Sequence, residues 1–325
     1  MSSRSRRVVA IADFDDPDVA ALWAHLEALS EFDLTWCRLG KGPASYDVAV
    51  TAEEARIEVD GEVVTSAVVR SADVIVYRRW RASPPRAAVD MGGDARCGFG
   101  NREWNATIDA ALEMWYGQPS SARWSRRPLA SSEKLRMMLR SARAGVRVPR
   151  FSVSNTPRVI IQESVLKAVN VDQRLDSGDR FSTTLVDGVI AREVAQGRLT
   201  IPTLVQEYVE PRREWRVVYC FGVIAAVEQR RLAGRAGPVD IRYAAVVRHV
   251  ATVPDEVAVQ ARLIADELQM QWFTLDVIQD SGDAYWIIDI NDDGLVCAAD
   301  DASQTLGRAV VEGIVGAAGS NRSIE

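Results

Sequence analysis

The sequence WFTLDVIQDSGDAYWIIDIN, residues 272–291, constrains the fold of this chain more than any other stretch. Two runs of β-branched and aromatic residues flank a Ser-Gly-Asp turn, a pattern that predicts a β-hairpin. We take Gly282 and Asp283 as the two loop residues. In that register Asp276 lies directly opposite Asp289, and both side chains point to one face because side chains alternate along a strand.

The same face of the predicted hairpin collects further oxygen-bearing side chains, since Thr274 lies opposite Asn291. Like charges that face each other across a sheet are destabilising, and a carboxylate pair is relieved by a proton or a cation. Carboxylate and amide oxygens suit a hard cation such as Mg²⁺. The alternative is a solvated acidic face on an edge hairpin, but the flanking aromatic residues favour a hairpin that packs in a core.

Length, composition and charge indicate an ordinary soluble protein. With 325 residues, 47% of them hydrophobic and 26% charged, the chain has room for a sizeable core and roughly two domains. A net charge of −6 disfavours a nucleic-acid-binding protein, which would usually carry an excess of positive charge. There is no signal sequence or long apolar run, and the four cysteines are scattered, so we expect a cytoplasmic protein without membrane contact. The two histidines are far apart in sequence, which disfavours histidine-based nucleophilic catalysis.

Lysine is unusually rare in this chain. Of the 39 basic residues only Lys41, Lys134 and Lys167 are lysines, and the other 36 are arginines. Arginine therefore replaces lysine wherever a general positive charge suffices. A lysine that remains either survives by chance or does something that arginine cannot, such as placing a compact ammonium group against a phosphate oxygen.

The order of predicted elements divides the chain into three parts. Residues 1–128 alternate strands and helices, including an Asp-Gly hairpin at residues 55–64, and predict an α/β domain. Residues 118–132 are rich in proline and serine and read as a linker. Residues 129–200 predict a helix and then short strands, and residues 201–325 predict strands, a helix, the acidic hairpin and a closing helix.

With these pieces in order, the chain resembles the ATP-grasp ligases, and within them the graspetide macrocyclases, which are related to ligases that add glutamate to a ribosomal protein. The resemblance runs almost end to end and rests on VIVYRRW, SSEKLRMMLRSARAGVRVP, VLKAV, PTLVQEYVEPRREWRVVY, DIR and FTLDVI…WIIDIN. It implies the ATP-grasp fold, in which an N-terminal α/β domain (the pre-ATP-grasp domain) precedes two α+β lobes that sandwich ATP.

The resemblance also assigns the phosphate end of an ATP site. It implies that Asp276, Asp289 and Asn291 hold the Mg²⁺ ions that bridge the ATP phosphates. Lys134 and Lys167 match positions where the family contacts those phosphates, which agrees with the compact ammonium expected from the scarcity of lysine.

The adenosine end follows from the segment between the second and third parts. The resemblance implies a hinge formed by Gln206, Glu207, Tyr208 and Val209, with backbone groups of Glu207 and Val209 reading adenine. Glu214 would accept hydrogen bonds from the ribose hydroxyls.

Two arginines complete the implied site. Arg216 and Arg242 match arginines that face the γ-phosphate and the reacting carboxylate, and residues 174–183 would form a loop over the phosphates. Solvent-exposed side chains on a surface are the alternative for both arginines, and for Glu207 and Glu214. In the implied reaction a carboxylate attacks the γ-phosphate to give an acyl phosphate and ADP, and an amine or hydroxyl then displaces phosphate. Positioning and charge neutralisation suffice for such a step.

Two departures from the family pattern leave the substrate open. Asp289 stands where the family more often has glutamate, and residues 292–304 replace the Gly-Gln-Trp-like segment of the macrocyclases. The first expectation is a macrocyclase that joins side chains of a precursor peptide. The second is a ligase for a free amino acid or a small natural-product intermediate. A phosphotransferase and an inactive ATP-binding regulator are rivals of other classes, and a homodimer is left open.

Overall fold

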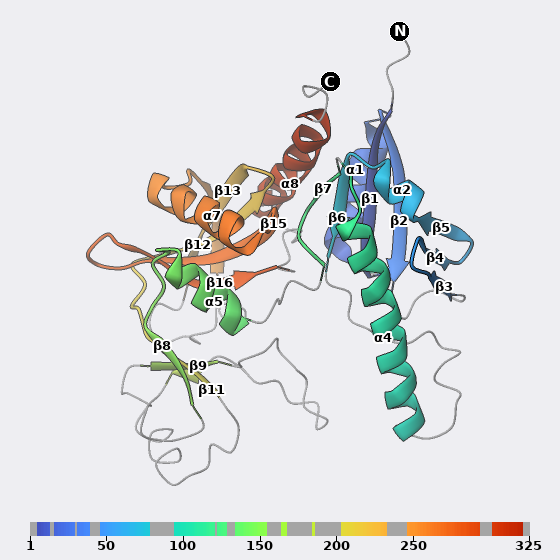
Figure 1. Cartoon of the computed structure of the whole chain (residues 1–325). Coiled ribbons are helices and arrows are strands. Elements are labelled where there is room, and N and C mark those ends of the chain that lie inside the picture. Colours follow the sequence, from blue (N-terminus) through green and yellow to red (C-terminus); the bar gives the residue numbers. More distant parts are fainter. Residues whose placement is uncertain are drawn as a thin grey trace.

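The structure is a computed structural model that describes residues 5–13, 16–29, 31–39, 46–78, 94–120, 122–128, 134–154, 164–167, 184–185, 203–232, 246–292 and 301–320. Its strands form a parallel N-terminal sheet, an antiparallel middle sheet, an antiparallel C-terminal sheet and a small three-stranded sheet beside the first (Figure 1).

The N-terminal sheet has the strand order β2-β1-β6-β7, and all its pairs are parallel. Its central strands are continuously apolar, as expected for a parallel sheet covered on both faces. The small sheet, β3-β4-β5, contains the predicted Asp-Gly hairpin, which is confirmed by positive φ angles at Asp60 and Gly61. The elements of this part are β1 (Arg6–Asp13), α1 (Pro17–Ala28), β2 (Phe32–Leu39), β3 (Tyr46–Val50), β4 (Ala55–Val59), β5 (Glu62–Thr65), α2 (Ser66–Arg70), β6 (Val74–Tyr77), α4 (Asp94–Gly117) and β7 (Arg123–Trp124).

The middle sheet has the order β10-β9-β11-β8, and its pairs are antiparallel. The amphipathic helix α5 precedes it and ends at Arg143, and Gly145 just beyond has a φ of 89°, the left-handed conformation that glycine favours after a helix end. The elements here are α5 (Lys134–Arg143), β8 (Phe151–Ser154), β9 (Ser164–Lys167), β10 (Thr184–Leu185) and β11 (Thr203–Glu207).

The C-terminal sheet has the order β14-β13-β12-β15-β16 and is antiparallel throughout. β12 and β13 are joined by a tight turn at Phe221 and Gly222, both with positive φ, as two-residue hairpins prefer. The elements are β12 (Arg213–Cys220), β13 (Val223–Arg231), β14 (Val246–Ala251), α7 (Asp255–Leu268), β15 (Trp272–Gln279), β16 (Tyr285–Asn291) and α8 (Asp301–Ser320).

The packing of the two large sheets is layered, with α8 between them (Figure 1). One core joins apolar residues of β1, β6, α1 and α8 to one face of the C-terminal sheet. A second core lies on the other face of that sheet, under α5 and α7. A third lies on the outer face of the N-terminal sheet, under α4 and the small sheet. The N- and C-terminal parts therefore share a hydrophobic core through α8.

The predicted acidic hairpin is confirmed, but its turn differs from the prediction. Asp276 pairs with Asp289, and Thr274 pairs with Asn291, as expected. The loop contains three residues, 281–283, because Asp280 already pairs with Ala284 through a backbone hydrogen bond. A β-bulge between Asp276 and its neighbour then shifts the register by one residue, and this restores the predicted pairs.

The predicted linker at residues 118–132 is partly wrong. Arg123 and Trp124 form β7, and the next two residues, Ser125 and Arg126, are buried. The serine content suggested a solvated segment, but the Ser125 hydroxyl is hydrogen-bonded to the backbone of Tyr77. None of the helices in the part of the chain that the structure describes is long and apolar enough to cross a membrane.

Candidate functional site

Three of the charged side chains that were predicted to act together, Arg216, Asp276 and Asp289, lie on one face of the C-terminal sheet. Cross-strand pairing aligns Arg216 on β12 with Asp276 on β15, and Asp276 with Asp289 on β16. Alternation along β12 puts Arg216 on the same face as Val218, which packs in the core beneath α8. The face is thus apolar where α8 covers it and charged beyond that cover.

Each carboxylate of this row contacts a cation. Arg216 donates to Asp276 Oδ1 over 2.7 Å, and both side chains are only about one-fifth exposed. Lys134, the first residue of α5, places Nζ 3.0 Å from Asp289 Oδ1. The Asn291 amide donates to the other oxygen of Asp289 over 3.3 Å. The structure therefore brings together residues 134, 216, 276, 289 and 291 from three separate segments.

Lys167 reaches the same strand from the middle sheet. It is buried at the end of β9, and its Nζ donates to the backbone carbonyl of Ile288 over 3.0 Å. Ile288 is the extra residue of the β-bulge, so it has no partner on β15. The bulge thus coincides with the point where the middle sheet contacts the strand that carries Asp289.

Positive charge dominates the electrostatics of Asp289. Burial by itself raises the pKa of this carboxyl, but the charges of Lys134, Lys167 and Arg216 outweigh burial and hold the pKa below its ordinary value. Asp289 is therefore ionised at neutral pH. The cluster has three cationic and two anionic side chains, and this excess of positive charge suits an anionic ligand.

The donor set fits a Mg²⁺ ion that is shared with a phosphate ligand. Among the described residues no three His, Cys, Asp or Glu side chains gather into a metal-binding group. Asp276, Asp289 and Asn291 supply two carboxylates and one amide oxygen, and Mg²⁺ at nucleotide sites needs only one or two carboxylates besides phosphate oxygens. The Thr274 hydroxyl, opposite Asn291, is fully buried and lacks a hydrogen-bond partner within the described residues.

Glu214 lies on the same sheet face, two residues before Arg216 on β12. It is 8% exposed, and Arg231 of β13 contacts both of its oxygens, at 2.7 and 3.3 Å. Burial raises the pKa of the Glu214 carboxyl, and the hydrogen bond from Arg231 opposes that shift. A carboxylate has about four acceptor positions, so Glu214 keeps capacity for a further donor such as a sugar hydroxyl.

The predicted hinge spans the end of β11 and the two residues after it. Gln206 is fully buried in that strand, whereas Tyr208 and Val209 are half-buried in the connection to β12. Arg150 contacts both carboxylate oxygens of Glu207, at 3.0 and 3.2 Å, and holds the pKa of that carboxyl below its ordinary value. The Glu207 amide donates to the Arg150 carbonyl, so this side of the hinge is tied to the chain before β8.

Solved structures with the same arrangement cover nearly the whole chain. The macrocyclase MdnC bound with the precursor peptide MdnA from Microcystis aeruginosa MRC has a TM-score of 0.74 at 15% identity, over 95% of this chain and 99% of that one. A RiPP-associated ATP-grasp ligase from Chryseobacterium gregarium, in complex with ADP and a leader and core peptide, has a TM-score of 0.73 at 14% identity, over 94% and 96%. D-alanyl-alanine synthetase A from Vibrio cholerae O1 biovar eltor has a TM-score of 0.59 at 15% identity, over 98% and 99%.

The chain has the ATP-grasp fold. This confirms the predicted fold class, a mixed α/β architecture with an α/β part before two antiparallel sheets. No protein-family model and no curated protein matches the sequence. Within this ATP-grasp fold the middle and C-terminal sheets meet at the contact between Lys167 and Ile288, beside the charged row.

Sequence reasoning about this site missed the partners of Glu207 and Glu214. Gly222 could have revealed Arg231, because a Phe-Gly turn between apolar runs predicts a hairpin whose register sets Arg231 near Glu214. No local signal marks Arg150, whose contact depends on the pairing of β8 with β11. Arg242 and the loop at residues 174–183 lie outside the described residues.

Proposed function

We propose that this chain is an ATP-dependent, ADP-forming ligase that joins a carboxylate to an amine or hydroxyl through an acyl phosphate. The observation that carries the proposal is the cluster of Lys134, Lys167, Arg216, Asp276 and Asp289 in a chain with the ATP-grasp fold. Two similar proteins of this fold are described as ligases or macrocyclases, and one of them is in complex with ADP.

The proposed substrate is a ribosomal precursor peptide, with ester or amide crosslinks formed between its side chains. MdnC and the Chryseobacterium ligase are each described in complex with a peptide. The second candidate is a free amino acid or a small natural-product intermediate, and it is supported by the similarity to D-alanyl-alanine synthetase. We propose that the enzyme acts in the cytoplasm, as a monomer or a homodimer.

The binding of nucleotide would follow from the contacts already described. Backbone groups of Glu207 and Val209 would hold adenine, and Glu214 would accept from the ribose. Lys134 and Lys167 each contact β16, so both ammonium groups lie within reach of phosphates bound over that strand. We propose three parts, at residues 1–128, 129–200 and 201–325, in which residues 203–207 of the third part pair with strands of the second.

The reaction would need charge neutralisation more than proton transfer. Asp276, Asp289 and Asn291 would hold Mg²⁺, which supplies electrostatic stabilisation of charge on the phosphate oxygens. Arg216 would orient the donor carboxylate, and Lys167 would balance charge on the transferred phosphoryl group. Arg242, by the family resemblance, would also face the γ-phosphate and the reacting carboxylate. Attack of the carboxylate oxygen breaks the bond to ADP, and the incoming nucleophile then releases phosphate and one proton.

Intact mass spectrometry tests this proposal. A candidate precursor peptide co-expressed with the enzyme should lose one water per bond formed, while ADP and phosphate accumulate instead of AMP and pyrophosphate. Hydroxylamine should trap a hydroxamate of the donor carboxylate, because an acyl phosphate reacts with any good nucleophile. The Asp289→Asn variant is the matched control and should leave the peptide unmodified.

Three outcomes would redirect the proposal. Water loss between two small molecules and not within a peptide would favour the amino-acid ligase. A stable gain of one phosphate without water loss would identify a phosphotransferase. Nucleotide binding without any turnover would identify a regulator and would overturn the ligase proposal.

A further inference from the structure

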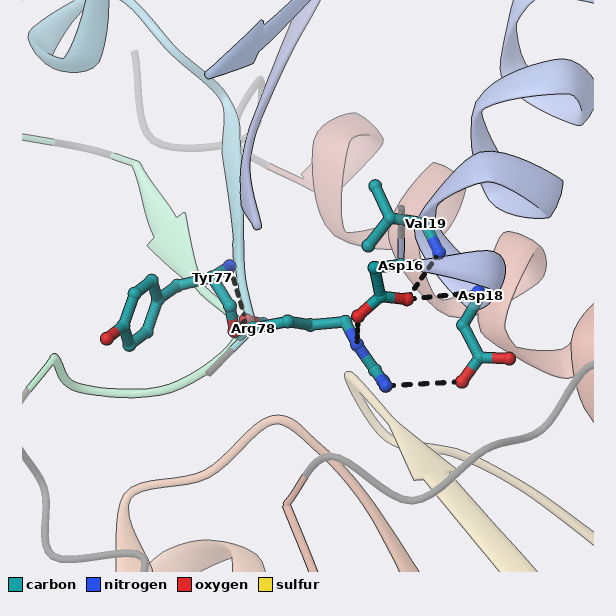
Figure 2. A network of polar contacts seen from close by, with 6 residues as sticks. Asp16, Asp18, Val19, Tyr77 and Arg78 are labelled. Atoms are coloured by element: carbon teal, nitrogen blue, oxygen red, sulfur yellow. Dashed lines mark hydrogen bonds and ion pairs between the residues drawn. The ribbon is translucent and has the colours of Figure 1, made fainter. Parts of the chain in front are cut away.

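Two buried arginines join the N-terminal sheet to one end of the β15–β16 hairpin. Figure 2 shows Arg78 between Asp16 and Asp18, where its Nε donates to Asp16 over 2.8 Å and a terminal nitrogen lies 3.3 Å from Asp18. The Arg78 guanidinium carbon is 4.7 Å from the ring centre of Trp272, the first residue of β15. This arginine therefore packs against the start of the hairpin.

The second arginine, Arg126, binds the other strand of the hairpin at the same end. Arg126 forms an ion pair with Asp292, and the two side chains are 5% and 3% exposed. Asp292 directly follows Asn291, one of the three candidate metal ligands. The Arg126 guanidinium carbon also lies 4.9 Å from the ring centre of Tyr77, so it is packed from the side of the N-terminal sheet.

The backbone beside Arg126 is fixed to both sheets as well. Ser125 donates its amide to the Ile75 carbonyl over 2.8 Å, and its hydroxyl contacts both the amide and the carbonyl of Tyr77. The Ser125 carbonyl in turn accepts the Trp272 amide over 3.0 Å. The start of β15 and the end of β16 are thus attached to one short segment, residues 125–126.

A buried ion pair adds little net stability to the contact between two segments. Removal of both charges from water costs about as much as their attraction returns, and an apolar pair of similar volume is often as stable or more stable. The ion pair instead fixes geometry, because the planar guanidinium sets the position and orientation of the carboxylate that it contacts. In this protein the fixed carboxylate belongs to the residue next to a candidate metal ligand.

We propose that Arg126 and Asp292 are positioning residues that set the place of Asn291 relative to Asp289 for Mg²⁺ binding. This inference rests on the proposed function, since it requires a nucleotide-bound metal at β16. It assigns neither residue a contact with metal or substrate. The rival interpretation is that the pair only stabilises the interface between the N- and C-terminal parts.

Metal affinity separates the two interpretations. Mn²⁺ replaces Mg²⁺ as the probe, and the loss of its free electron paramagnetic resonance signal gives the dissociation constant for ADP-saturated enzyme. The variants are Asp292→Asn, which keeps the shape of the side chain but removes its charge, and Arg126→Lys, which keeps the positive charge but lacks the planar guanidinium group. The matched control is Arg123→Gln at the same interface, because Arg123 contacts Phe221 and Ser320 and not the hairpin end.

We expect Asp292→Asn to weaken Mn²⁺ binding about tenfold or more, as loss of a residue that orients metal ligands does. Arg126→Lys should keep only part of the wild-type affinity for Mn²⁺, and Arg123→Gln should bind Mn²⁺ like the wild type. ADP affinity without metal should be unchanged in all three variants. If the ion pair only stabilises the interface, substitutions in it should lower thermal stability and leave Mn²⁺ affinity unaltered.

A double variant keeps the inference testable if a single substitution prevents folding. Arg126→Met with Asp292→Leu replaces the pair by apolar side chains and should fold, yet bind Mn²⁺ weakly. Wild-type Mn²⁺ affinity in any folded variant of this pair overturns the positioning role and leaves the proposed function intact. A wild-type protein that binds neither ADP nor Mn²⁺ overturns the proposed function itself.

Discussion

Gly313 and Gly316 lie three residues apart in α8, and alanine should have opposite effects at the two positions. A Cβ atom built on Gly313 would lie 2.3 Å from the Cys220 carbonyl oxygen and 2.9 Å from its carbonyl carbon. A Cβ built on Gly316 meets nothing within 4 Å. The difference arises because Gly313 faces the backbone of Cys220 at the end of β12.

The expected magnitudes follow from these distances. Cys220 ends the third strand of a five-stranded sheet and pairs with a strand on each side. Its carbonyl therefore cannot move away from α8 without disturbing those strand pairings. Overpacking of this kind costs about 1–3 kcal/mol or more, and the gain in helix propensity from glycine to alanine returns about 1 kcal/mol. Because the clash at 2.3 Å is with backbone, the upper end of that cost applies, and Gly313→Ala should destabilise the protein by a net of about 2 kcal/mol or more. Gly316→Ala should stabilise it by up to about 1 kcal/mol, from propensity alone.

Urea unfolding followed by tryptophan fluorescence measures both effects, because Trp272 lies in the same core as α8. The midpoint should fall for Gly313→Ala and rise for Gly316→Ala at similar slopes. A Gly313→Ala variant as stable as the wild type would refute the close approach of α8 to β12. A loss of stability in both variants would refute the argument that contact with Cys220 causes the difference.

Three further results are expected. Asp289→Asn should lower Mg²⁺-dependent ATP turnover by about 100-fold or more, since metal stabilisation is worth several kcal/mol, while metal-free ADP affinity in calorimetry stays equal or rises; unchanged turnover would contradict the metal assignment. Lys167→Ala should weaken ATP binding and Lys167→Arg should restore it poorly, because a forked guanidinium cannot replace a point charge beside the Ile288 carbonyl; equal affinity of both variants and the wild type would exclude a phosphate contact. Burial raises the pKa of Cys37 to about 12 and that of Cys220 further, so peptide mapping after iodoacetamide treatment at pH 8.5 should find both thiols unlabelled until urea is added.

The site illustrates which parts of a structure are encoded locally. The alternation of apolar and polar residues predicted that Asp276 and Asp289 share one face, because the period of a strand is a local property, whereas their pairing was predicted from an assumed two-residue loop. The predicted loop length was wrong, since the loop has three residues instead of two. The bulge at Ile288 compensates for that error, and it lies where Lys167 contacts the strand.

The linker shows how local composition can mislead. Serine, proline and arginine at residues 118–132 are typical of a solvated connection, yet Ser125 and Arg126 are buried. Their polar atoms are satisfied by Tyr77 in the N-terminal sheet and by Asp292 after β16. Those partners are far away in sequence, so no window of residues around the linker contains the information.

The sequence by itself determined most of the strands and helices that the structure describes, the acidic face of one hairpin and the scarcity of lysine that singled out Lys134 and Lys167. These are consequences of periodicity and residue chemistry within short stretches. Only the tertiary structure decided that Lys134 lies 3.0 Å from Asp289, and that Lys167 contacts the neighbouring residue of the same strand. Those contacts join segments more than 100 residues apart, and they arise because α5 packs onto β16 and the end of β9 brings Lys167 to the same strand. The shared core around α8, likewise, has no signature in any single segment, since burial depends on what the rest of the chain places on the other side.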